Sequence, residues 1–104
     1  MKKKILLTLI EIEIELKTMS LWDEKELEKH RFESNLPFSL DTMEPYQWLQ
    51  WVLIPKMKET INNDGDLVHG FSVYPYFEDV WIDEKPKKLL DLLHSLDTLV
   101  NTIY

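Results

Sequence analysis

The side chains best able to carry out chemistry are few and stand far apart in the sequence. The three histidines, His30, His69 and His94, form neither an H-x3-H nor an H-E-x-x-H pattern, whereas a zinc site needs three or four ligands at close spacing. The chain has no cysteine, which excludes disulfides, thiolate metal clusters and a cysteine nucleophile. We therefore predict no bound metal and no cofactor.

Two carboxylates, Asp41 and Glu44, are three residues apart and in principle close enough to act as an acid and a base. With Thr42 they also precede Pro45, which is the start signal of a helix. The simpler interpretation is that Asp41 or Thr42 caps this helix and Glu44 lies in its first turn. Only two glycines occur, too few for a phosphate-binding loop, so the sequence gives no support for an enzyme.

Trp48 and Trp51 are the most informative side chains, because residues three apart share one face of a helix. Between Trp48 and Ile54, Gln50 is the one polar residue. This helix is therefore either the central helix of a bundle, which we favour, or partly covered by another chain.

Seven residues make up the candidate binding site: Asp41, Thr42, Glu44, Trp48, Gln50, Trp51 and Tyr76. The leading hypothesis is an aromatic surface around Trp48 to Tyr76 that binds another protein or a second copy of the chain. The alternative is a small-molecule binder or enzyme with a pocket near Trp48, Trp51 and Tyr76. Complete burial of every tryptophan in a monomer would contradict the leading hypothesis.

The N-terminal element has conflicting signals. Residues 10–16 alternate between Ile or Leu and Glu, as a half-buried strand does. Over a longer window, Ile5, Leu9, Ile12 and Leu16 follow steps of four, three and four, and neither Gly nor Pro interrupts them. We predict a helix over about 3–21 with a wide apolar face.

The remaining pattern also favours helices. A second helix begins near Pro45 and bends at Pro55. We predict that Pro45 and Pro55 have structural roles. A turn follows over 62–66, Gly70 marks a break, a short helix follows Pro75, and an amphipathic helix runs from Pro86 to the end. The fold class is all-α, a small closed bundle of three to four helices in one domain, 1–104.

The charge of the chain limits the kinds of molecule that it is expected to bind. The formal net charge is -7, and residues 32–81 carry two lysines against eight carboxylates, which argues against direct nucleic-acid binding and favours a basic protein partner. The apolar run after Lys2 to Lys4 ends at Glu11, too short for a bilayer span and without a cleavage site. We predict a cytoplasmic protein.

The middle of the chain has an unusual composition: Pro37-Phe38, then 41–45 (DTMEP), then 48–55 (WLQWVLIP), then Met57. This pattern resembles the YqcC-like family of small bacterial proteins, and looser similarity covers nearly the whole chain. The resemblance implies an all-helical bundle and supplies no established catalytic residues. Genes of that family often lie beside that of a tRNA pseudouridine synthase, which implies a tRNA-modification context.

Overall fold

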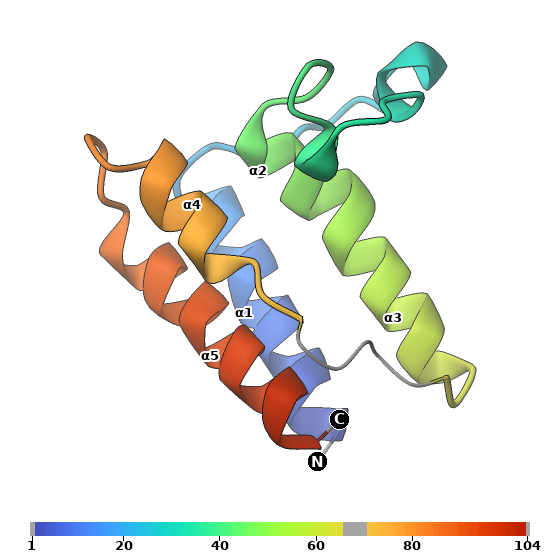
Figure 1. The fold of residues 1–104 in the computed structure, drawn as a ribbon, viewed down its shortest axis with the longest axis vertical. Coiled ribbons are helices and arrows are strands. Elements are labelled where there is room, and N and C mark those ends of the chain that lie inside the picture. Colours follow the sequence, from blue (N-terminus) through green and yellow to red (C-terminus); the bar gives the residue numbers. More distant parts are fainter. Residues whose placement is uncertain (1, 66–70, 104) are drawn as a thin grey trace.

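The described part of the chain is helical. The computed structural model describes residues 2–65 and 71–103, the last of them by its backbone alone. Its elements are α1 (Lys2–Thr18), the 3-10 helices η1 (Lys29–Phe32) and η2 (Pro37–Ser39), α2 (Pro45–Trp48), the π-helical turn η3 (Leu49–Leu53), α3 (Ile54–Asn62), α4 (Tyr74–Val80) and α5 (Lys87–Ile103). Counting α2, η3 and α3 as one bent helix, these residues form four helices and no strand, which confirms the predicted all-α class (Figure 1).

α1 settles the conflict between strand and helix. Ile12 is fully buried, whereas Ile10 and Ile14 are 46% and 56% exposed. In a strand these three residues would share one face. In the helix, Ile12 lies on the buried face with Leu9 and Leu16, and Ile10 and Ile14 remain outside.

α1 and α5 are the most extensively packed pair of helices in the described part of the chain. They pack against each other and run in opposite directions, so the start of α1 lies at the same end as the finish of α5 (Figure 1). α5 contributes Leu89, Leu93, Leu96 and Val100, all fully buried and spaced by one helical turn. Side chains from α3 and α4 complete the same core: Ile54, Met57, Ile61 and Phe77.

The bend in the middle helix comes from η3, which ends two residues before Pro55. The N–H of Ile54 donates to the carbonyl of Leu49, five residues back. Pro55 has no N–H for the carbonyl of Trp51, and its ring would collide with that carbonyl in a regular α-helix. The wider π-helical turn accommodates the proline at this place.

The start of the middle helix differs in one detail from the sequence prediction. Pro45 is the first helical residue, as expected, but Glu44 is the N-cap. Its backbone N–H donates to Oε1 of Gln47 at 2.9 Å. The prediction that Asp41 or Thr42 caps this helix is therefore wrong, because both lie before the residue that Pro45 makes the cap.

Asp41 and Thr42 instead hold together the connection between α1 and α2. The Ser34 hydroxyl donates to the Asp41 carboxylate. The Thr42 hydroxyl donates to the carbonyl of Arg31 at 2.6 Å, and the Arg31 guanidinium donates to the carbonyl of Thr42 at 3.0 Å. This connection is irregular apart from η1 and η2.

α4 is attached to α5 by Asp97, a side chain that is only 9% exposed. Its carboxylate accepts the N–H of Val73 at 2.9 and 3.0 Å and that of Tyr74 at 2.8 Å, which supplies partners for the free amides at the start of α4. Pro75 lies in the first turn, so the predicted short helix is confirmed. The predicted turn after α3 is present at residues 63–64. Asp66, His69 and Gly70 lie outside the described residues.

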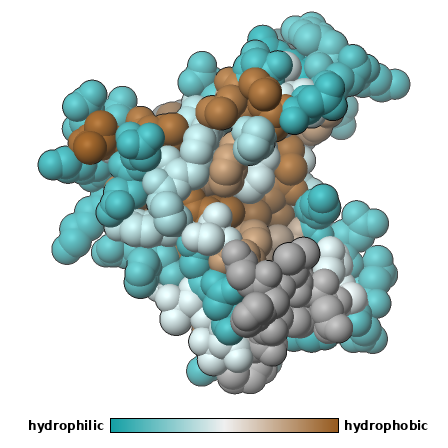
Figure 2. Space-filling model, viewed as in Figure 1, coloured by the Kyte–Doolittle hydropathy of each residue, from teal (hydrophilic) through white to brown (hydrophobic). Residues whose placement is uncertain are grey.

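Figure 2 shows apolar side chains in the middle and upper part of this face, with hydrophilic side chains along much of its edge. No helix in the described part of the chain has the length and apolar character needed to cross a membrane.

Candidate functional site

Five aromatic side chains from separate elements meet and form what we call the aromatic cluster: Phe38 of η2, Trp48 of α2, Tyr76 and Phe77 of α4, and Trp81 after α4. Phe38 stacks on Tyr76 with ring centroids 4.0 Å apart and contacts Trp48 at 4.8 Å. Phe77 is fully buried, and the other four are half-buried. The cluster therefore joins three elements while its outer rings keep part of their surface exposed.

Phe38 reaches this position with a strained backbone. Its φ of 58° and ψ of 17° lie in the left-handed region, and Ser39 follows with a φ of 50°. For residues other than glycine this conformation costs about 1–2 kcal/mol, because the β-carbon approaches the following carbonyl. The ring contacts with Tyr76 and Trp48 offset that cost and hold η2 against α2 and α4.

A second set of hydrogen bonds attaches the beginning of the connection between α1 and α2 to the bent helix through Asp23. The buried Gln50 accepts the N–H of Asp23 at 2.7 Å and donates to its carbonyl at 2.8 Å. The Asp23 carboxylate accepts the indole N–H of Trp51 at 3.3 Å and the amide of Gln47 at 3.1 Å. Gln50 and Trp51 therefore point toward Asp23, and neither belongs to the aromatic cluster.

The seven residues predicted as a site thus separate into groups. Trp48 and Tyr76 come together through Phe38, Gln50 and Trp51 come together through Asp23, and Asp41 and Thr42 bind the connection. Glu44 is the N-cap of α2, and its charge also affects Tyr76 of the aromatic cluster. Burial, and then the charge of Glu44, raise the pKa of Tyr76.

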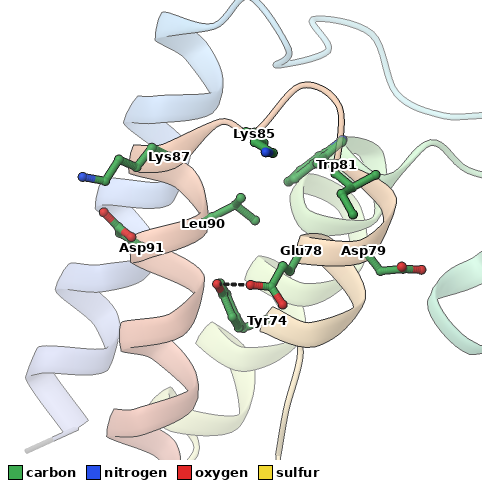
Figure 3. A pocket seen from close by; sticks show the side chains of 9 residues that line it. Tyr74, Glu78, Asp79, Trp81, Lys85, Lys87, Leu90 and Asp91 are labelled. Atoms are coloured by element: carbon green, nitrogen blue, oxygen red, sulfur yellow. Dashed lines mark hydrogen bonds between the residues drawn. The ribbon is translucent and has the colours of Figure 1, made fainter.

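An open pocket lies between α4 and the start of α5, and we call it the α4–α5 pocket (Figure 3). Its volume is about 680 Å³. Its lining contains none of the seven predicted residues: Tyr74, Glu78, Asp79, Trp81, Ile82, Lys85, Lys87, Leu90 and Asp91. Trp81 also belongs to the aromatic cluster, so the two features adjoin.

The lining of this pocket carries both signs of charge, with Asp91 beside Lys87 on α5 and Glu78 beside Tyr74 on α4 (Figure 3). The hydroxyl of Tyr74 donates to the Glu78 carboxylate at 2.6 Å, and this hydrogen bond is the main reason that the pKa of Tyr74 is raised, with smaller contributions from burial and from the charges of Glu78 and Asp91. Figure 3 shows Lys85 and Lys87 near the connection that leads into α5, and Tyr74 with Glu78 farther along the pocket.

Sequence reasoning missed this pocket because its residues come from both sides of the break at Pro86. One signal was present: Trp81 and Ile82 are adjacent apolar residues flanked by Glu78, Asp79, Asp83 and Glu84. Among the described residues, no three His, Cys, Asp or Glu side chains are grouped so that they could hold a metal ion.

Fold and site together define a small helical bundle with a half-buried aromatic cluster and an adjacent open pocket. Residues 4–99 match the family DUF446, described as "tRNA pseudouridine synthase C", and the chain belongs to this family. The resemblance to YqcC-like proteins is also confirmed. "Uncharacterized protein YqcC" of Escherichia coli (strain K12) is 40% identical over 98 residues, which are 92% of this chain and 90% of that protein.

Further relatives agree with this assignment. An "Uncharacterized protein" of Haemophilus influenzae is 32% identical over 92 residues, covering 88% of this chain and 87% of the relative. A solution NMR structure of protein YqcC from E. coli superposes with a TM-score of 0.85 at 36% identity, over 96% of this chain and 87% of that one. "tRNA pseudouridine synthase C" of Pectobacterium carotovorum is 40% identical over 57 residues, which are 55% of this chain and 15% of that protein.

Proposed function

We propose that this protein is an accessory module that binds a tRNA pseudouridine synthase by protein–protein contact. The observation that carries the proposal is the match to the Pectobacterium synthase, in which a segment similar to this chain is a small part of the polypeptide. Joining two segments in one polypeptide raises the effective concentration of each for the other. Such joining is useful when the two segments act in contact.

The surface supports a protein contact over an RNA contact. The formal net charge of -7 opposes binding to a phosphate backbone and attracts a basic surface. An enzyme that acts on tRNA presents basic residues to its substrate. The four tryptophans, Trp22, Trp48, Trp51 and Trp81, are all half-buried, so aromatic surface is accessible for an interface.

The test uses the purified full-length chain and the tRNA pseudouridine synthase C of the same organism. Size-exclusion chromatography with light scattering measures the mass of the mixture, and calorimetry measures the dissociation constant. A complex of defined stoichiometry is expected. Absence of a complex at both low and high salt would contradict the proposal.

A parallel arm separates the protein contact from an RNA contact. The chain alone is mixed with tRNA in a gel-shift assay at low and high salt. No shift is expected, because a formal net charge of -7 opposes binding to a phosphate backbone. A gel shift that disappears at high salt, together with no binding to the synthase, would contradict the proposed protein contact and favour direct binding to RNA.

A further inference from the structure

The α4–α5 pocket has an apolar middle that the bundle leaves uncovered. Trp81 and Leu90 face each other across it (Figure 3). Ile82, which also lines the pocket, is 59% exposed, the largest value among the exposed large apolar side chains of the described residues. The volume of about 680 Å³ lies within the range of ligand pockets, roughly 300–1,000 Å³. The space fits several side chains of a peptide segment.

The charges of the lining favour a cationic occupant. Three carboxylates, Glu78, Asp79 and Asp91, line the pocket against Lys85 and Lys87. Glu78 and Asp79 lie in the last turn of α4, where the free carbonyls already carry partial negative charge, so helix α4 does not stabilise them. Neither Asp79 nor Asp91 forms an ion pair with another residue in the described ranges.

We propose that the α4–α5 pocket binds an apolar side chain and a neighbouring Lys or Arg of a partner protein. The partner is the synthase, a choice that rests on the function proposed above. The apolar side chain lies between Trp81 and Leu90, and its cationic neighbour faces Glu78. Lys85 and Lys87 repel a cation from the other end, which fixes the direction of the bound segment.

The pocket is tested directly with a short probe. The ¹⁵N-labelled full-length chain is titrated with the peptide acetyl-Arg-Leu-Arg-amide, and with acetyl-Glu-Leu-Glu-amide as the control. The indole N–H signals of the four tryptophans report the place of binding, because Trp81 lines the pocket whereas Trp22 and Trp51 do not. A saturable shift of Trp81 with the cationic peptide alone is expected. Equal shifts with both peptides, or no shift at Trp81, would overturn the proposal.

The synthase arm uses two matched variants. Ile82→Ala removes apolar surface from the pocket, and Ile14→Ala removes the same atoms from α1, where the side chain is 56% exposed. Both side chains are exposed, so both variants fold. Ile82→Ala should weaken binding of the synthase about tenfold, the effect of a central interface residue, while Ile14→Ala should leave the affinity within about twofold.

The two arms separate failure of the pocket from failure of the function. If the wild-type chain binds the synthase and Ile82→Ala binds equally well, the pocket proposal is wrong and the accessory function stands. If the synthase does not bind but the cationic peptide shifts Trp81, the accessory function fails and the pocket keeps its specificity for a cationic apolar segment.

Discussion

At the scale of single residues, the side chains that join distant segments are polar or aromatic. Sequence patterns mark some of them as unusual but do not identify their partners. Gln50 interrupts an apolar run, and the sequence marks it as unusual without naming a partner. The structure pairs it with both backbone groups of Asp23, 27 residues away. A buried amide on an otherwise apolar helix thus has a specific partner, as buried polar groups require.

Replacing Gln50 should therefore lower the stability of the protein, because the backbone groups of Asp23 would lose their partner. Gln50→Leu keeps the apolar packing but removes both bonds to the backbone of Asp23, which should lower the free energy of unfolding by about 2 kcal/mol. Asp23→Ala is the control, because it retains those backbone bonds and should cost about 1 kcal/mol. Urea unfolding measures both variants. Equal stabilities of Gln50→Leu and the wild type would show that water replaces the lost partner.

Phe38 gives a second prediction, because its ring contacts offset its strained backbone. Phe38→Ala keeps the left-handed backbone but loses the stack on Tyr76 and the contact with Trp48. We expect a loss of about 1–3 kcal/mol in unfolding free energy and a red shift of tryptophan emission. Phe32→Ala, in the same connection and at a side chain that is 46% exposed, should change stability by less than about 0.5 kcal/mol. Similar losses in the two variants would contradict this account.

At the scale of elements, burial decided what local alternation could not. The pattern of residues 10–16 matches a strand as well as a helix, and only the spacing of Ile5, Leu9, Ile12 and Leu16 over a longer range selects the helix. The same kind of spacing, among the leucines of the C-terminal segment, predicted α5. The capping residue could not be chosen in this way, because Asp41, Thr42 and Glu44 all have side chains that are able to cap.

The helical period of α1 can be tested with neighbouring isoleucines. Ile12→Ala should cost about 2–4 kcal/mol, because Ile12 is fully buried. Ile14→Ala should cost less than about 1 kcal/mol, because that side chain is mostly exposed. Thermal and urea unfolding of the two variants under the same conditions provide the comparison. Equal costs would mean that the two residues share a buried face, as they would in a strand.

At the scale of the whole molecule, the fold class and most helix positions follow from periodicity, proline positions and turn residues. The candidate site follows less well. Contacts such as Phe38 with Tyr76, or Asp97 with Val73, join residues far apart in the chain, and no local pattern specifies them. The α4–α5 pocket depends in the same way on how α4 docks against α5, and none of the seven residues predicted from the sequence lines it.

The net charge of the whole chain leads to a kinetic prediction for the proposed complex. Because opposite charges attract over a Debye length, association with a basic synthase should slow about tenfold between roughly 50 and 300 mM NaCl. Dissociation should change by less than about twofold, since contacts between apolar side chains depend little on salt. Stopped-flow fluorescence measures both rates. An association rate that is independent of salt would show that long-range attraction does not contribute.

The opposite directions of α1 and α5 have one more consequence. The first turn of α1 and the last turn of α5 are neighbours at one end of the bundle (Figure 1). A domain with adjacent ends can be inserted into a surface loop of a larger protein, entering and leaving through a single opening. The α4–α5 pocket is lined by the first turns of α5, at the other end of that helix. A larger protein that carried this fold as an insertion would therefore be joined to it at one end of the bundle, and the α4–α5 pocket would remain accessible at the other end.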